Sequence, residues 1–137
     1  MSDSIDLEKL NSFIPPFGKL LGIKIVEANK DLVIGELPIT DDLLTLPGRM
    51  HGGAIMGFAD NLGAIATVIN LGPGQWTTTI ESKTNFLRAA AKGTILRGEA
   101  RPIHKGRKTH VWRTDMFNDA GKLAATVTQT QMILEKN

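Results

Sequence analysis

The chain has 137 residues, of which 42% are hydrophobic and 22% charged, with a formal net charge of +2 at pH 7. These values are typical of one globular domain and exclude a disordered or fibrous chain. The net charge is too small to imply nucleic-acid binding, and the absence of cysteine excludes disulfides and thiolate metal sites.

The N-terminal sequence MSDSIDLEKL is acidic where a secretory signal requires a basic start, so we expect a cytoplasmic protein. A short helix is predicted over residues 6–13, stopped by Pro15 and Pro16. Residues 1–15 are therefore interpreted as a helical extension of a single domain spanning 1–137. Two strands and a polar loop should follow, over residues 22–28, 31–39 and 40–50.

The strongest helix signal runs from Gly53 to Leu71. Its large hydrophobic residues recur at i, i+3, i+7, i+10 and i+14 and so share one face: Ile55, Phe58, Leu62, Ile65 and Ile69. The opposite face carries small residues and one acid, Asp60. Polar and glycine interruptions favour a buried helix over a membrane span. Gly57 and Gly63 disfavour a helix, and they would serve either close backbone packing or room for a substrate.

Four β-like segments complete the chain: 76–88, 94–104, 109–118 and 122–134. Turn residues at 91–93, 105–107 and 118–121 predict that they are joined as antiparallel hairpins. Six antiparallel strands with one apolar helix against them form an α+β layout. A six-stranded sheet wrapped around one long helix is the hotdog fold, which we therefore expect.

Two glycines open the long helix, in the segment His51-Gly52-Gly53. The first N–H groups of a helix have no intrahelical partner and carry positive potential. Such groups suit the oxyanion that develops on a thioester carbonyl. A flexible entry turn without a ligand is the alternative interpretation.

Asp60 lies about two turns into the same helix, on its small-residue face. A carboxylate in an apolar helix is costly unless it has partners or a task. It could activate water as a base, attack the thioester as a nucleophile, or be a buried acid satisfied by strand hydroxyls. Gly52 and Asp60 are about 12 Å apart along the axis. If both act on one carbonyl, they must come from two subunits.

The segment HGGAIMGFADNLGAIAT resembles the HGG-x6-D helix of the PaaI-like hotdog thioesterases, and the resemblance extends over residues 15–135. It implies an acyl-CoA thioesterase for aromatic or medium-chain acyl groups. Asp60 would be the base or nucleophile, and the N–H of Gly52, with Gly53 beside it, would polarise the carbonyl. A strand Ser or Thr that orients water would correspond to Thr79. The sequence departs from the family pattern at Thr45, where some members have Asn, and at Arg88-Ala89-Ala90, where Arg-Pro-Ala is common.

His51 and Asn61 flank the motif residues and are interpreted as structural, with the His51 ring N–H groups holding the loop. No Asp-x4-His pattern of a hydratase is present on this helix. His104 and His110 flank a basic turn and are expected at the surface. Three scattered histidines indicate no metal site, and no cofactor is expected.

Basic residues gather at the turn near residues 101–108. They are either a solvated turn or a cradle for the phosphates of CoA. We predict a CoA-binding set made of Lys105, Arg107 and Lys108 from this turn, with Arg88 as a further contributor from outside it. Little aromatic interleaving accompanies them, so neither a nucleic-acid partner nor a membrane is expected.

Two functions remain open. One is hydrolysis of acyl-CoA by a homodimer with shared active sites, assembled as a dimer of dimers. The other is a non-catalytic hotdog module that binds acyl-CoA. Asp60 favours the hydrolase, because a binding module needs no acid beside the thioester.

Overall fold

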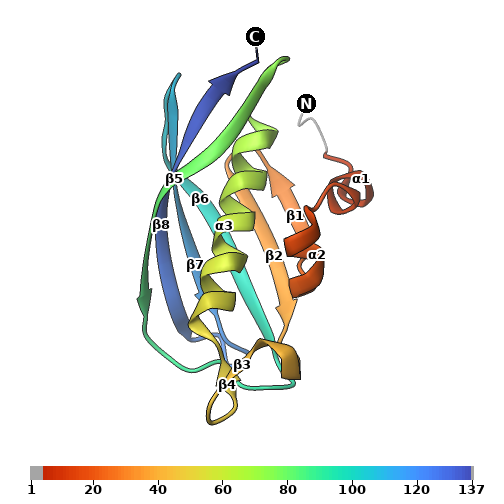
Figure 1. The fold of residues 1–137 in the computed structure, drawn as a ribbon, viewed down its shortest axis with the longest axis vertical. Coiled ribbons are helices and arrows are strands. Elements are labelled where there is room, and N and C mark those ends of the chain that lie inside the picture. The colour runs from red at the N-terminus through yellow and green to blue at the C-terminus, as the bar shows by residue number, and fades with distance from the viewer. Residues whose placement is uncertain (1–4, 137) are drawn as a thin grey trace.

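The computed structural model describes residues 5–136 as a six-stranded antiparallel sheet with one long helix, α3 (Gly52–Ile69), lying on its face (Figure 1). The predicted hotdog fold is confirmed. The strands of the sheet are β1 (Lys24–Asn29), β2 (Leu32–Pro38), β5 (Gln75–Phe86), β6 (Ile95–Lys105), β7 (Thr109–Phe117) and β8 (Leu123–Glu135). The other elements are α1 (Leu7–Ser12), α2 (Pro16–Leu21), η1 (Asp41–Leu43) and the short pair β3 (Leu44–Thr45) and β4 (Arg49–Met50).

The strand order is β1-β2-β6-β7-β8-β5, which corrects one of the predicted hairpins. The β6–β7 and β7–β8 hairpins form as predicted, but β5 pairs with β8 and not with β6. Turn residues show where a chain reverses, but not which strand becomes its neighbour. Here the segment after β5 crosses from the sheet edge to its centre, where β6 pairs with β2.

Helix α3 packs closely on the sheet because two neighbouring strands each carry a glycine where the helix touches them. Gly35 of β2 and Gly98 of β6 are register partners. A Cβ atom at Gly98 would lie 2.6 Å from Leu62 Cδ1, and one at Gly35 would lie 2.7 Å from Leu62 Cδ2. Phe58 and Leu62 are 0% exposed as a result. Burial of side chains of this size stabilises the fold by about 1.5–3 kcal/mol each.

Helix α2 was not predicted from the sequence. Pro15-Pro16 does end the first helix, but proline also fits the first turn of a helix, and Pro16 starts α2. Gly22, with a φ of 93°, ends it. The Phe17 ring of α2 covers Gly57, where an added Cβ atom would lie 2.8 Å from Phe17 Cε2. Gly63 likewise faces the Gln129 side chain. The two glycines thus make room for protein side chains, not for backbone or substrate.

Helix α3 has the length and hydropathy of a possible membrane span, but half of the helix is buried inside the fold. It contacts β2, β5, β6, β7 and β8. It is therefore the core helix of the domain.

The two edges of the sheet differ in their cover. At the β1 edge, the Asn11 side chain of α1 bonds both the N–H and the C=O of Ile25, at 2.8 and 2.9 Å. In Figure 1, α1 and α2 lie on this side of α3, and β5 lies on the other. The β5 edge has no such cover within residues 5–136. A long open edge favours pairing with another strand.

Candidate active site

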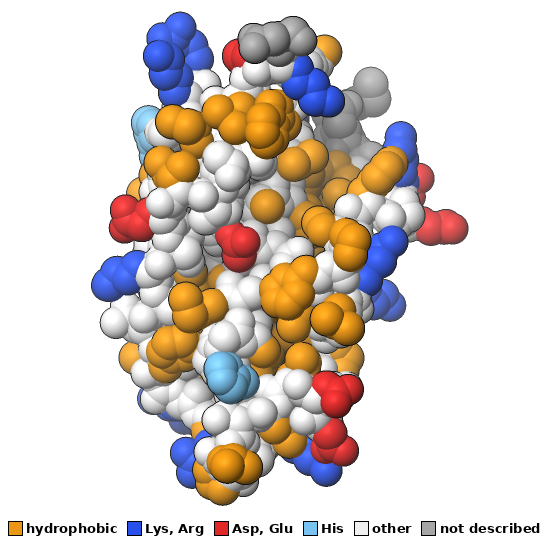
Figure 2. Space-filling model, viewed as in Figure 1, with side chains coloured by type: hydrophobic (Ala, Val, Ile, Leu, Met, Phe, Trp, Pro, Cys, Tyr) orange, Lys and Arg blue, Asp and Glu red, His pale blue; other side chains and the backbone are white. Residues whose placement is uncertain are grey.

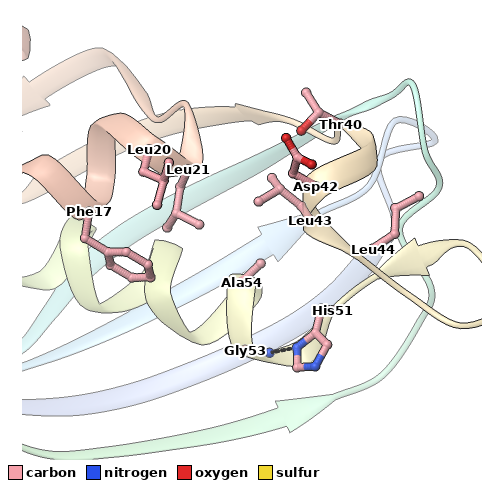
Figure 3. A pocket seen from close by; sticks show the side chains of 10 residues that line it. All are labelled: Phe17, Leu20, Leu21, Thr40, Asp42, Leu43, Leu44, His51, Gly53 and Ala54. Carbon is pink, nitrogen blue, oxygen red and sulfur yellow. Dashed lines mark hydrogen bonds between the residues drawn. The ribbon is translucent and has the colours of Figure 1, made fainter.

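The start of α3 presents one free N–H group. His51 is the N-cap, and its Nδ1 accepts a hydrogen bond from the Gly53 N–H at 2.8 Å (Figure 3). His51 thus acts through a ring acceptor and not, as expected, through a ring N–H. The Gly53 N–H is occupied, whereas the Gly52 N–H has no hydrogen-bond partner in the described part of the chain. Of the two predicted glycines, Gly52 has the N–H that could polarise a carbonyl.

Asp60 and Thr79 are brought together from α3 and β5. The Thr79 hydroxyl donates to Asp60 Oδ1 at 2.6 Å, and both residues are half-buried. The hydroxyl proton of Thr79 points to the carboxylate of Asp60. Towards a water molecule, Thr79 could therefore act only as a hydrogen-bond acceptor. Asp60 Oδ2 accepts no hydrogen bond within residues 5–136 and is free for chemistry.

Behind this pair lies a buried polar group that sequence analysis missed. Gln131 Nε2 donates to Thr79 Oγ1 at 2.6 Å, and Thr77 Oγ1 donates to Gln131 Oε1 at 2.9 Å. Gln129 Nε2 approaches Asp60 Oδ1 at 3.4 Å, which is a weak contact. The two glutamines are 1% and 0% exposed. The available signal was their spacing along β8, because every second residue from Ala125 through Val127 to the two glutamines is buried on one face.

Two hollows flank the N-terminus of α3. The first, of about 410 Å³, is mainly apolar and lies between α2, η1 and α3; Figure 3 shows Phe17, Leu20, Leu21, Leu43 and Ala54 around it. His51 and Gly53 also line it. The second, of about 350 Å³, contains Gly52 together with Thr45, Phe86 and Arg88. A group bound at the Gly52 N–H would have an apolar space on one side and an arginine on the other.

Asn61 faces away from Asp60. It is buried, its Nδ2 donates to the Gly57 carbonyl at 2.8 Å, and its Oδ1 lies where a Cβ atom on Gly18 would clash. Its position at the α2–α3 contact agrees with a structural role.

The predicted CoA-binding residues divide between the two ends of the molecule. Arg88 lies beside Gly52, and its Nη1 donates to the Leu123 carbonyl at 2.9 Å. Lys105 lies where α3 ends, and its Nζ bonds Asp31 at 2.6 Å and Asn70 at 3.5 Å. Arg107 and Lys108 are exposed and form no ion pair within residues 5–136. One subunit does not bring Arg88 and this turn together.

His110 is buried and not at the surface, which corrects the sequence expectation. It lies on the inner side of β7 at 6% exposure, beside the Trp112 ring at a centroid distance of 6.4 Å. The alternation along β7 turns it inward together with Trp112 and Thr114. Within the described residues, no group of three His, Cys, Asp or Glu side chains could hold a metal ion.

A sequence profile of the Thioesterase superfamily matches residues 47–125, which contain α3 and the first strands after it. The chain belongs to the thioesterase superfamily. Its enzymes are hydrolases that act on thioester bonds, and this chain is one of them.

Named relatives agree over nearly the whole chain. The Pseudomonas aeruginosa putative esterase PA1618 is 31% identical over 131 residues, covering 94% of this chain and 90% of that protein. The crystal structure of a mutant of this P. aeruginosa thioesterase superposes with a TM-score of 0.91 at 29% identity, covering 97% and 96% of the two chains. The 1,4-dihydroxy-2-naphthoyl-CoA hydrolase of Escherichia coli is 28% identical over 133 residues, covering 95% and 96%.

A Streptococcus mutans protein solved with bound acetyl CoA superposes with a TM-score of 0.78 at 26% identity, covering 85% of this chain and 91% of that one.

Proposed function

We propose that this thioesterase hydrolyses acyl-CoA, with Asp60 as base or nucleophile and the Gly52 N–H polarising the thioester carbonyl. The observation that carries the proposal is the Asp60 carboxylate, which has one oxygen fixed by Thr79 and the other free. The acetyl CoA in the S. mutans neighbour and the CoA ester hydrolysed by the E. coli relative support this substrate class.

As a base, Asp60 would take a proton from water as the water oxygen attacks the carbonyl carbon. Collapse of the tetrahedral adduct breaks the C–S bond, and the proton passes to the departing CoA thiolate. As a nucleophile, Asp60 would displace the thiolate and form an anhydride that water then hydrolyses. In either route the Gly52 N–H stabilises the oxyanion.

The acyl group would occupy the apolar hollow between α2 and α3. Its lining is mostly leucine, phenylalanine and alanine side chains, together with Asp42 and Thr40 (Figure 3). A space of about 410 Å³ accepts an aromatic or medium-chain acyl group.

The active site would be completed by a second copy of the chain. Gly52 and Asp60 lie about 12 Å apart on one helix, too far to flank one carbonyl. The open β5 edge lies beside both, because Thr79 bonds Asp60 and the Phe86 ring faces Gly52. Antiparallel pairing of two β5 strands about a two-fold axis would bring Gly52 of one subunit towards Asp60 of the other.

The same pairing would assemble the CoA-binding residues. The turn between β6 and β7 lies at the start of β5, since the Lys108 carbonyl accepts from Ile133, the register partner of Thr77. Arg88 lies just beyond the end of β5. A two-fold axis through β5 would place the turn of one subunit near Arg88 of the other. Arg107 and Lys108 would then be available for CoA phosphates, while Lys105 stays with Asp31.

A second interface would make a dimer of dimers. Figure 2 shows hydrophobic side chains spread over the face that carries α3, with most charged side chains at its margins. Exposed apolar residues on this face are Phe13, which follows α1, together with Phe17, Leu20, Met56 and Val68 on the helices. Such a surface favours contact with another subunit.

A panel of acyl-CoA esters, assayed for free thiol without added metal, tests the proposal. We expect turnover of at least one aromatic or medium-chain ester, and Asp60→Asn should lower it by about 10²-fold or more. Asp115→Asn is the matched control, because Asp115 also accepts a threonine hydroxyl, that of Thr126 at 2.8 Å, but lies on β7 away from α3. Binding without turnover across the panel would instead favour the non-catalytic acyl-CoA-binding module.

A further inference from the structure

A chain of four polar side chains ends at Asp60. Thr77 donates to Gln131, Gln131 donates to Thr79, and Thr79 donates to Asp60, with distances of 2.9, 2.6 and 2.6 Å. The Thr77 hydroxyl lies equally close, at 2.9 Å, to the Met132 carbonyl oxygen, so that its one proton is shared between two acceptors. Gln131 is 0% exposed. A glutamine buried on the inner face of a sheet costs free energy unless both ends of its amide are bonded, and here both are.

The direction in which these hydrogen bonds run is set by the single proton of the Thr79 hydroxyl. The Thr79 hydroxyl has one proton, and the amide nitrogen of Gln131 points at its oxygen. The hydroxyl must therefore accept from Gln131 and send its own proton to Asp60 Oδ1.

A reversed amide would break this order. The Gln131 oxygen would then face Thr79 and compete with Asp60 Oδ1 for the single hydroxyl proton. The amide orientation in the structure thus directs the Thr79 proton to Asp60 Oδ1 and leaves Oδ2 free.

We propose that Gln131 is a positioning residue for Asp60, acting through Thr79, with Thr77 holding the amide oxygen of Gln131 in place. The inference rests on the proposed function of Asp60 and extends it to buried residues of β5 and β8. Gln131 touches no substrate. It fixes which way the Thr79 hydroxyl points, and so which carboxylate oxygen faces the thioester.

Turnover of the best acyl-CoA ester is measured for the parent, Gln131→Met, Thr79→Val and the double variant. Methionine keeps the volume and removes both hydrogen bonds. We expect each single variant to lower kcat by about 10- to 100-fold, the scale for a misplaced catalytic group, with KM within about two-fold. The double variant should be no slower than Thr79→Val alone, because both changes act on one path.

Thr77→Val is a second variant that leaves Gln131, Thr79 and Asp60 unchanged and lies at a half-buried position. It should also lower kcat, by a smaller factor than Gln131→Met or Thr79→Val. Thr114→Val is the matched control: its buried hydroxyl, on β7, has no hydrogen-bond partner among the described residues. It should keep the parental kcat.

A measurement without turnover separates this inference from the proposed function. The side-chain amide signals of Gln131, followed by NMR, should shift in Asp60→Asn and should no longer respond to that change in a Thr79→Val background. Unmoved amide signals would overturn the inference, even in a protein that hydrolyses no acyl-CoA. A parental kcat in Gln131→Met, or losses that multiply in the double variant, would overturn it equally.

Discussion

His110 is buried beside the Trp112 ring and close to Lys105 and His104. Burial lowers the pKa of its imidazole. The Gly106 backbone opposes this, while Lys105 and His104 lower the pKa further. The neutral form is therefore the one that the fold accommodates.

This environment predicts a loss of stability in mild acid. As pH falls below 6.5, the ordinary histidine pKa, the unfolded chain takes up a proton at residue 110 that the folded chain does not. Stability then falls with a slope of up to about 1.4 kcal/mol per pH unit, until the lowered pKa of the folded state is reached. Urea unfolding of the parent and His110→Gln between pH 7.5 and 5.5 measures the difference.

His110→Gln should lose the part of the pH dependence of the unfolding free energy that comes from residue 110, whatever its stability at pH 7.5. Thr114→Val is the control, since it changes a buried group on the same strand that has no charge, and it should keep the parental slope. Parallel curves for parent and His110→Gln would contradict the assignment.

At the residue scale, the sequence predicted which residues form the site better than it predicted where their side chains point and what they bond. Asp60 and Thr79 do meet, and His51 does hold the helix start. The glutamines behind them were missed because strand alternation gives the facing of a side chain but not its partner. His110 was misplaced for a related reason: a basic turn nearby suggested exposure, whereas alternation along β7 turns the ring inward.

At the scale of elements, local signals and tertiary pairing contributed differently. The apolar repeat of α3 and the turns after β6 and β7 are local properties, and sequence predicted them. The second helix and the β5–β8 pairing depend on contacts with distant elements. Phe17 packs on Gly57, and β5 pairs with β8, which lies far from it along the chain. Neither contact has a signature in its own segment.

The turn between β6 and β7 should set CoA affinity and not the chemical step. Neutralising Arg107 and Lys108 together, as Arg107→Gln with Lys108→Gln, should raise KM and leave kcat near the parental value. Binding should also become less dependent on salt, because exposed charges are screened. Steady-state kinetics at two ionic strengths measures both effects.

Lys9→Gln with Lys24→Gln removes the same charge from α1 and β1, at the opposite edge of the sheet. That pair should leave KM unchanged. An equal rise of KM in both double variants would make the effect one of net charge, and an unchanged KM in the first would reduce the turn to a solvated hairpin.

At the scale of the whole molecule, the difference between the two sheet edges favours a particular assembly. Asn11 occupies the β1 edge with its side-chain amide, so a neighbouring strand would have to displace it. The β5 edge is 12 residues long and carries exposed apolar side chains at Trp76, Ile80 and Phe86. Pairing there would cover the open edge and, by symmetry, complete two active sites at once.

The sharing of active sites can be tested by mixing two inactive variants, Asp60→Asn and Gly52→Pro. Gly52 is the first residue of α3, where proline is well tolerated, and His51 before it has the extended conformation that proline requires, with φ −66° and ψ 136°. Gly52→Pro therefore removes the N–H while the helix start is kept; Gly52→Ala, which retains the N–H, is its control. Circular dichroism and size-exclusion chromatography check folding and assembly.

A mixed dimer would contain one site with both an intact Asp60 and an intact Gly52 N–H. Random reassociation of equal amounts makes half of the dimers mixed, so up to about a quarter of parental activity should return. Mixtures that stay inactive, although both variants assemble and exchange subunits, would show that the sites are not shared. In that case one subunit would have to supply both Gly52 and Asp60 to its own substrate, and the argument from the roughly 12 Å between them would fail.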